Sequence, residues 1–178
     1  MQKPEILSER TLLKSPIFTV IERQLRLETG QIITRQIVKK TKNSVLMVIQ
    51  DVDTNKVFVQ DEYRAGIDAI TTGFPAGMID EGENIYQAAA REVKEETGYI
   101  VNEQQITVLD EGALSEGFCD EVTTAVLVRV NANTSKGAQE FDDGEYVNNG
   151  QFVDLNEAMD NLTSISAVMA VHAIKNLD

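Results

Sequence analysis

Short apolar and β-branched stretches recur along most of the chain. Residues 17–28 and 31–38 predict two strands joined around Thr29-Gly30, and residues 44–50 form the continuous apolar run typical of a buried strand. The same kind of pattern predicts further strands at residues 57–60, 68–74, 106–114, 122–130 and 145–153. We therefore expect strands to supply most of the regular structure before residue 154.

One central segment has helical periodicity instead. Asn84 is a predicted N-cap with Gln87 three residues later, and Gly98 is placed to end this helix in a left-handed turn. The residues between them are mostly strong helix formers.

Two further helices are predicted near the end of the chain. Asp154, with Glu157 as its capping-box partner, predicts a short helix, and residues 166–177 predict a final one. Strands around one central helix, followed by helices, predict an α+β fold with helices packed against a mixed sheet.

Two glutamates of the central helix are predicted to lie on its apolar side, where a surface helix would normally carry no charges. At about 100° per residue, Glu92 and Glu96 fall within about 20° of the apolar Ile85, and Glu95 falls about 80° away. Charges aimed into a protein interior are costly unless they are compensated. A hard divalent cation held by oxygen ligands is the compensation that we predict, although a solvated acidic helix end is the alternative.

Charge and composition narrow the function classes. The net charge is −13, and it divides into +5 for residues 1–42 (9 − 4) and −18 for residues 43–178 (7 − 25). This acidic bulk argues against nucleic-acid binding. The single Cys119 excludes an internal disulfide and a multi-cysteine zinc site, and the single His172 argues against histidine-based catalysis. We expect a cytoplasmic protein with no membrane span and no signal peptide.

A fixed frame of residues surrounds the acidic helix, in the stretch GMIDEGENIYQAAAREVKEETGY. Gly77, Glu83, Arg91-Glu92-Val93, Glu95-Glu96 and Gly98 resemble the Nudix box of Nudix hydrolases, with Tyr99 where an aliphatic residue is usual. The resemblance implies an α/β/α sandwich with a mixed sheet, in which the box forms a loop, a helix and a loop.

The resemblance extends to the ADP-ribose pyrophosphatase branch of that family. Residues 60–64, 74–77 and 117–121 carry it, and the branch also begins with an N-terminal antiparallel strand subdomain, as residues 5–40 do here. We therefore predict a β-hairpin subdomain over residues 1–42 and a Nudix hydrolase domain over residues 43–178. The sequence departs from the branch at three places. The branch often has a glutamine directly before the Tyr-Arg pair, whereas Asp61-Glu62 intervene here, and it often has a proline where Glu116 precedes Gly117. A glutamate is also common where Gly73 lies.

The resemblance and the helix pattern together assign site residues. Carboxylate and carbonyl oxygens suit Mg²⁺, with Mn²⁺ as the alternative. The predicted metal ligands are the carbonyl of Ala76 and the carboxylates of Glu92, Glu95 and Glu96. The predicted catalytic residues are Glu121 as the base, Glu95 and Arg91, and the predicted substrate-binding residues are Arg64, Arg35 and Phe18.

These assignments predict a metal-dependent enzyme that splits the diphosphate linkage of a nucleoside diphosphate derivative. ADP-ribose, giving AMP and ribose 5-phosphate, is the leading substrate. The alternatives are another nucleoside diphosphate sugar, or a regulatory domain that binds a nucleotide sugar without turnover. The resemblance also predicts a homodimer that exchanges its basic N-terminal segment, although packing within one chain would satisfy the charge asymmetry equally well.

Overall fold

The computed structural model describes residues 2–140 and 147–175. Two compact units make up the chain: Met1–Asn43 with Gly112–Val122, and Ser44–Glu111 with Thr123–Asp178. The strands are β1 (Glu5–Lys14), β2 (Phe18–Arg26), β3 (Ile32–Lys40), β4 (Ser44–Asp51), β5 (Lys56–Arg64), β6 (Ala69–Gly73), β7 (Ala76–Met78), β8 (Ile106–Ala113), β9 (Val122–Val130) and β10 (Val147–Val153). The helices are α1 (Ile85–Thr97), the 3₁₀ turn η1 (Glu103–Gln105), α2 (Leu155–Asn161) and α3 (Ile165–Lys175).

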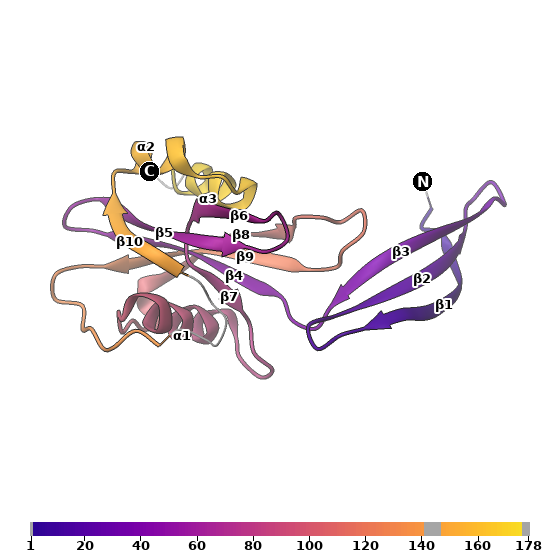
Figure 1. Cartoon of the computed structure of the whole chain (residues 1–178), viewed down its shortest axis with the longest axis horizontal. Coiled ribbons are helices and arrows are strands. Elements are labelled where there is room, and N and C mark those ends of the chain that lie inside the picture. The colour runs from indigo at the N-terminus through magenta and orange to yellow at the C-terminus, as the bar shows by residue number, and fades with distance from the viewer. Residues whose placement is uncertain (1, 141–146, 176–178) are drawn as a thin grey trace. The chain divides into compact units, whose positions relative to one another are not determined.

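The first unit is a three-stranded antiparallel sheet with the order β1-β2-β3 (Figure 1). The predicted hairpin is confirmed as β2 and β3. The pattern of apolar residues had not predicted β1, because nearly all of its side chains are exposed. Ion pairs between β1 and β2 accompany their pairing: Arg10 with Glu22, Arg26 with Glu5, and Arg23 with Glu9.

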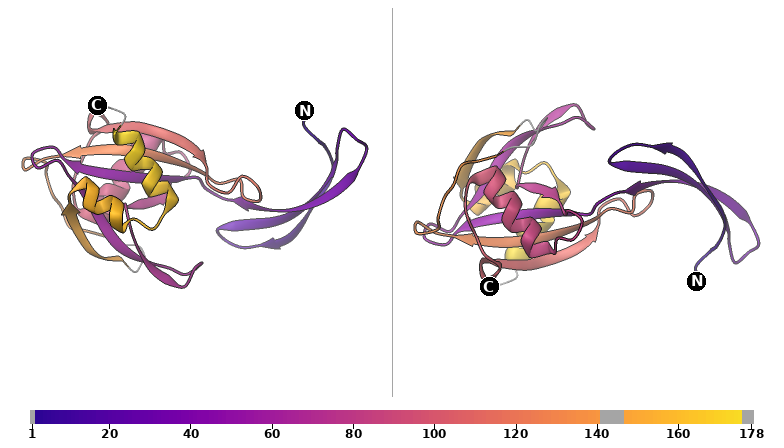
Figure 2. Two further views of the ribbon diagram at one scale, coloured as in Figure 1. Left: turned by 90° about the horizontal axis from the view of Figure 1, so that it is seen from above. Right: turned by 90° about the horizontal axis from the view of Figure 1, so that it is seen from below.

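The second unit contains a mixed sheet with the order β10-β5-β4-β9-β8. Strands β4 and β9 are parallel, whereas β5 pairs antiparallel with β4, β6 and β10. Helix α1 covers one face of this sheet, and α2 and α3 cover the opposite face (Figure 2). The predicted α+β class, with helices on both faces of a mixed sheet, is confirmed.

The two faces of the sheet have separate apolar cores, and β5 supplies side chains to both. Phe58 packs with Val93 and the alanines of α1, whereas Val57 and Val59 pack with Val171 and its neighbours on α3. This alternation follows from the period of two along a strand, and it sets which β5 side chains meet the acidic helix.

Helix α1 begins and ends as its sequence predicts. Asn84 and Gln87 form both hydrogen bonds of a capping box, and Gly98 ends the helix with φ 77°. The predicted capping box of α2 is wrong, because the side chain of its N-cap Asp154 makes no capping hydrogen bond. Residues 145–146 of the predicted last strand and residues 176–177 of the predicted last helix lie outside the described residues.

Within residues 2–140 and 147–175, no helix combines the length and the apolar character that crossing a membrane requires.

Candidate active site

Two glutamates lie on the buried side of α1, as the helical pattern predicts. Glu92 is 8% exposed and Glu96 is 4% exposed, beside the fully buried Val93. The side chain of Glu95 lies at the edge of this buried stripe and is 28% exposed. Two carboxylates one helical turn apart therefore face the sheet rather than the solvent.

The strand that faces Glu92 has no room for a side chain at Gly77. Strand β7 pairs antiparallel with β4, placing Gly77 opposite Val45. A Cβ atom built on Gly77 would overlap the carboxylate of Glu92. Only glycine lets the backbone of β7 approach this carboxylate so closely, and Ala76, the predicted carbonyl ligand, comes directly before it in the same strand.

Arg91 connects the loop before α1 with the acidic side of the helix. Its Nε and Nη2 atoms donate to the two carboxylate oxygens of Glu83 at 2.9 and 3.0 Å. Its Nη1 donates to Glu92 at 2.9 Å and to Glu95 at 3.0 Å, and Nη2 also donates to the carbonyl of Met78 at 2.8 Å. The planar guanidinium thereby fixes three carboxylates and the end of β7 relative to one another.

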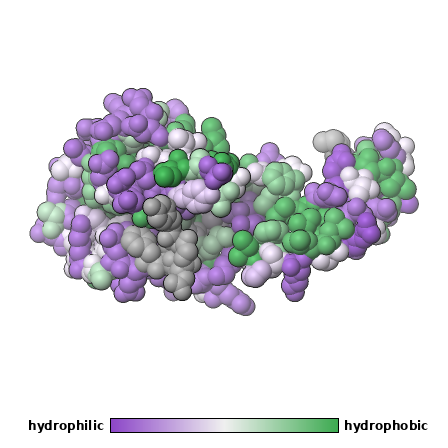
Figure 3. Space-filling model, in the orientation of Figure 1, coloured by the Kyte–Doolittle hydropathy of each residue, from purple (hydrophilic) through white to green (hydrophobic). Residues whose placement is uncertain are grey.

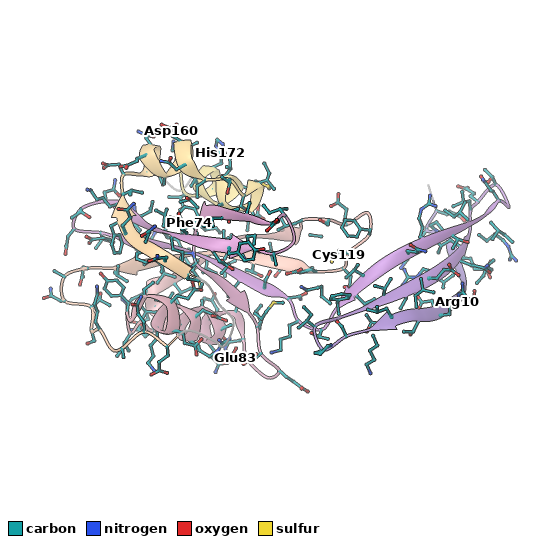
Figure 4. All side chains as sticks on the ribbon, viewed as in Figure 1. Arg10, Phe74, Glu83, Cys119, Asp160 and His172 are labelled. Carbon is teal, nitrogen blue, oxygen red and sulfur yellow. The ribbon has the colours of Figure 1, made fainter. Side chains whose placement is uncertain are left out.

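The contact with Arg91 also favours the ionised form of Glu83. Hydrogen bonds from Arg91 lower the pKa of Glu83 below its ordinary value, against the opposing effect of burial, and the backbone N–H of Asp80 adds a bond of 3.0 Å. The same contact with Glu83 raises the pKa of Arg91. Figure 4 labels Glu83 in the loop that precedes α1. The ion pair of Glu83 with Arg91 thus connects this loop to α1.

Two glutamines to which the sequence analysis gave no role in the site make hydrogen bonds with Glu96. The Nε2 of Gln60, on β5, donates to the carboxylate Oε2 of Glu96. The Nε2 of Gln139 donates to the backbone carbonyl of Glu96 at 2.5 Å, and the N–H of Glu140 donates to the carbonyl of Glu95 at 2.9 Å. The sequence did contain one signal for this, because Gln60 is a polar residue directly after a buried apolar run.

The predicted substrate-binding residues lie in different parts of the chain. Arg64, in the second unit, is exposed at the end of β5, where its Nη1 pairs with Glu62 at 2.8 Å. Arg35 and Phe18 belong to the first unit. Arg35 is exposed and its Nη1 donates to the carbonyl of Thr34 at 3.0 Å, whereas Phe18 is half-buried. Arg64 and Arg35 thus each bond to a residue of their own strand.

The predicted base, Glu121, belongs to the first unit and is half-buried. Its Oε2 lies 3.4 Å from the Nζ of Lys40. The neighbouring Asp120 accepts from the backbone N–H of Lys40 at 2.8 Å and pairs with Lys39 at 3.0 Å. These bonds lower the pKa of Asp120 even though burial acts to raise it. Structurally, both carboxylates join the segment before β9 to β3.

The donor atoms beside α1 suit a hard divalent cation, because they are carboxylate and carbonyl oxygens. They lie next to β7, where the missing side chain of Gly77 makes room for the carboxylate of Glu92. In the part of the chain that the structure describes, no three His, Cys, Asp or Glu side chains already converge as a metal site. The carboxylates contact Arg91 and Gln60 instead. The exposed His172 on α3 lies on the other side of the sheet from α1 (Figure 4).

The chain resembles known proteins along most of its length. The family model described as the NUDIX domain matches residues 40–171. The ADP compounds hydrolase NudE of Escherichia coli is 35% identical over 58% of this chain, and the match spans 55% of that protein. The ADP-ribose pyrophosphatase of Bacillus subtilis is 29% identical over 79% of this chain and 76% of that protein.

A solved structure agrees with these sequence matches. A crystal structure titled ADP compounds hydrolase superposes with a TM-score of 0.86 at 25% identity, covering 99% of this chain and 95% of that chain. The likeness therefore includes the N-terminal strands as well as the sheet that carries α1. Because the family model covers most of the sequence, including helix α1 and strand β7, this chain belongs to the NUDIX family of hydrolases.

Proposed function

We propose that this protein is a metal-dependent hydrolase that splits the diphosphate linkage of a nucleoside diphosphate derivative, with ADP-ribose as the leading substrate. The observation that carries the proposal is the pair of buried glutamates on α1, with Gly77 directly against one of them. Two relatives whose names specify ADP compounds or ADP-ribose support the choice of substrate.

The metal would be held by oxygen atoms of this one region. Nudix hydrolases generally use divalent metal ions. We assign Mg²⁺, with Mn²⁺ as the alternative, to the carboxylates of Glu92, Glu95 and Glu96 and the carbonyl of Ala76. When bound, the ion would supply positive charge for the diphosphate oxygens. Arg91 contacts both Glu92 and Glu95, so it would orient these ligands.

In the proposed reaction, a water oxygen forms a bond to one phosphorus atom of the diphosphate. The bond from that phosphorus to the bridging oxygen breaks, so ADP-ribose and water give AMP and ribose 5-phosphate. Glu121 is proposed as the base that takes the water proton, on the strength of its place in the resembling motif. Arg64 is proposed to neutralise phosphate charge as the bond breaks.

The direct test is a panel of nucleoside diphosphate compounds incubated with the protein and Mg²⁺. A phosphatase in the same assay releases inorganic phosphate only from the monoester products, because the intact diphosphate has no terminal phosphate. We expect ADP-ribose to be the best substrate, activity to vanish in excess EDTA, and activity to return with Mg²⁺ or Mn²⁺. Full turnover in excess chelator would contradict the mechanism, and tight binding of ADP-ribose without product would favour a regulatory domain.

We also propose a homodimer in which the N-terminal segment of one copy contributes Arg35 and Phe18 to the site of the other. Residues 1–42 carry +5 whereas residues 43–178 carry −18, so the segment is attracted to an acidic surface. Its sheet also exposes large apolar side chains, and Figure 3 shows hydrophobic residues gathered on this unit. On the strands these side chains are Ile6, Leu12, Leu13 and Ile32, and Ile17 lies directly before β2; each is more than 40% exposed.

The shared site can be tested by mixing two inactive variants, Arg35→Glu and Glu96→Gln. We expect light scattering to give the mass of a dimer, and mixed dimers to regain part of the activity because one of their two sites has both intact halves. A monomeric mass, or no regain after subunit exchange has been demonstrated, would rule out the shared site.

A further inference from the structure

A buried glutamine occupies a position on β5 that the strand pattern would give to an apolar residue. Gln60 is 3% exposed and comes directly after the buried run Val57-Phe58-Val59. Because side chains alternate along a strand, Gln60 lies on the same side as Phe58, which packs in the α1 core. A polar side chain in this environment requires a specific partner.

That partner is the carboxylate of Glu96. The amide Nε2 of Gln60 donates to Glu96 Oε2, and both side chains are almost completely buried. The last torsion of a glutamate has a broad, nearly two-fold energy profile, so hydrogen bonds decide how the carboxylate plane is turned. The contact from Gln60 sets this orientation from the sheet side, while Gln139 holds the backbone carbonyl of the same residue at 2.5 Å.

We infer that Gln60 is a positioning residue, which turns the carboxylate of Glu96 so that it binds the divalent cation. This inference rests on the proposed function, in which Glu96 is a metal ligand. Residues that hydrogen-bond to a metal ligand typically alter metal affinity or activity by about 10- to 100-fold when they are replaced. A neutral amide serves this purpose because it donates a hydrogen bond without adding a cation that would compete with the metal.

The test measures metal binding without turnover. Mn²⁺ is titrated into the substrate-free protein, and the free ion is followed by electron paramagnetic resonance. We expect Gln60→Met, which keeps the length of the side chain but removes the donor, to weaken Mn²⁺ binding about tenfold or more. The Mg²⁺ concentration for half-maximal activity should rise by a similar factor, while kcat at saturating Mg²⁺ changes much less.

Gln50→Met is the matched control. Gln50 lies on the neighbouring strand β4 and also donates a side-chain hydrogen bond, but its partner is Asn55 at 2.6 Å rather than a glutamate. This variant should bind Mn²⁺ like the wild type. If Gln60→Met does not fold, as judged by circular dichroism, Gln60→Asn takes its place in the Mn²⁺ titration. The asparagine amide is one methylene too short to reach Glu96, so this variant should also bind Mn²⁺ more weakly.

The outcomes separate the inference from the proposed function. A wild-type protein that does not bind Mn²⁺ would overturn the proposed metal dependence, and the inference with it. A wild-type protein that binds Mn²⁺, together with folded Gln60 variants of unchanged affinity, would overturn the inference alone. An equal loss in Gln50→Met would also overturn it, because the effect would not be specific to the contact with Glu96.

Discussion

Replacing Glu96 by glutamine is expected to lower kcat by about 10²-fold or more at saturating Mg²⁺, because one anionic oxygen ligand is lost. The change is nearly isosteric, which matters for a side chain that is only 4% exposed. The amide oxygen of the new glutamine can still accept the hydrogen bond that Gln60 gives to Glu96. Packing and hydrogen bonding are thus largely retained while the charge is removed.

The thermal unfolding temperature of Glu96→Gln distinguishes catalysis from stability. A buried carboxylate is costly without compensation, so the metal-free variant should unfold at a temperature no lower than that of the wild type. The matched control is Glu103→Gln, the same chemical change at an exposed residue of the 3₁₀ turn η1, which should leave kcat unchanged. Wild-type turnover by a folded Glu96→Gln protein would contradict the assignment of Glu96 as a metal ligand.

Replacing Glu121 by glutamine is expected to lower kcat by about 10²-fold while KM changes little, as for the loss of a general base. The competing explanation is structural, since Glu121 pairs with Lys40 at 3.4 Å. A partly exposed ion pair of this kind contributes only roughly 0–1 kcal/mol to stability. Its loss alone would shift the unfolding temperature slightly and leave kcat nearly unchanged.

Lys40→Gln breaks the same ion pair from the other side and is therefore the control for Glu121→Gln. If Glu121 is the base, only Glu121→Gln should lose turnover. An equal loss in both variants would assign the effect to the ion pair. Wild-type kcat in Glu121→Gln would place the base elsewhere, with Asp120 and Glu116 as the next residues to replace.

Strand β1 of the first unit shows why a pattern of apolar and polar residues fails to predict some strands. The hairpin of β2 and β3 was predicted because its β-branched residues partly alternate. In β1, every residue except Leu7 is exposed, so the strand has no buried face that a pattern of apolar residues could indicate. Its pairing with β2 accompanies ion pairs between residues such as Arg10 and Glu22, whose match is visible only once the chain is folded.

The capping box predicted at Asp154 is also wrong because the folded structure decides which contacts form. The spacing of Asp154 and Glu157 is that of a capping box, and α2 does begin directly after Asp154. The side chain nevertheless makes no capping bond, because a local motif only permits a hydrogen bond and the surrounding structure selects the side-chain orientation. At Asn84 the same kind of motif forms both bonds.

The sequence by itself determined the ends of α1 and the burial of Glu92 and Glu96, because both depend on residues within a few positions of one another along a helix. Tertiary structure decided which groups meet these glutamates. Gln60 lies 36 residues from Glu96 and Gln139 lies 43 residues from it. The contact of Gln60 depends on the register of β5, because a shift by one residue would turn Gln60 to the opposite face of the sheet.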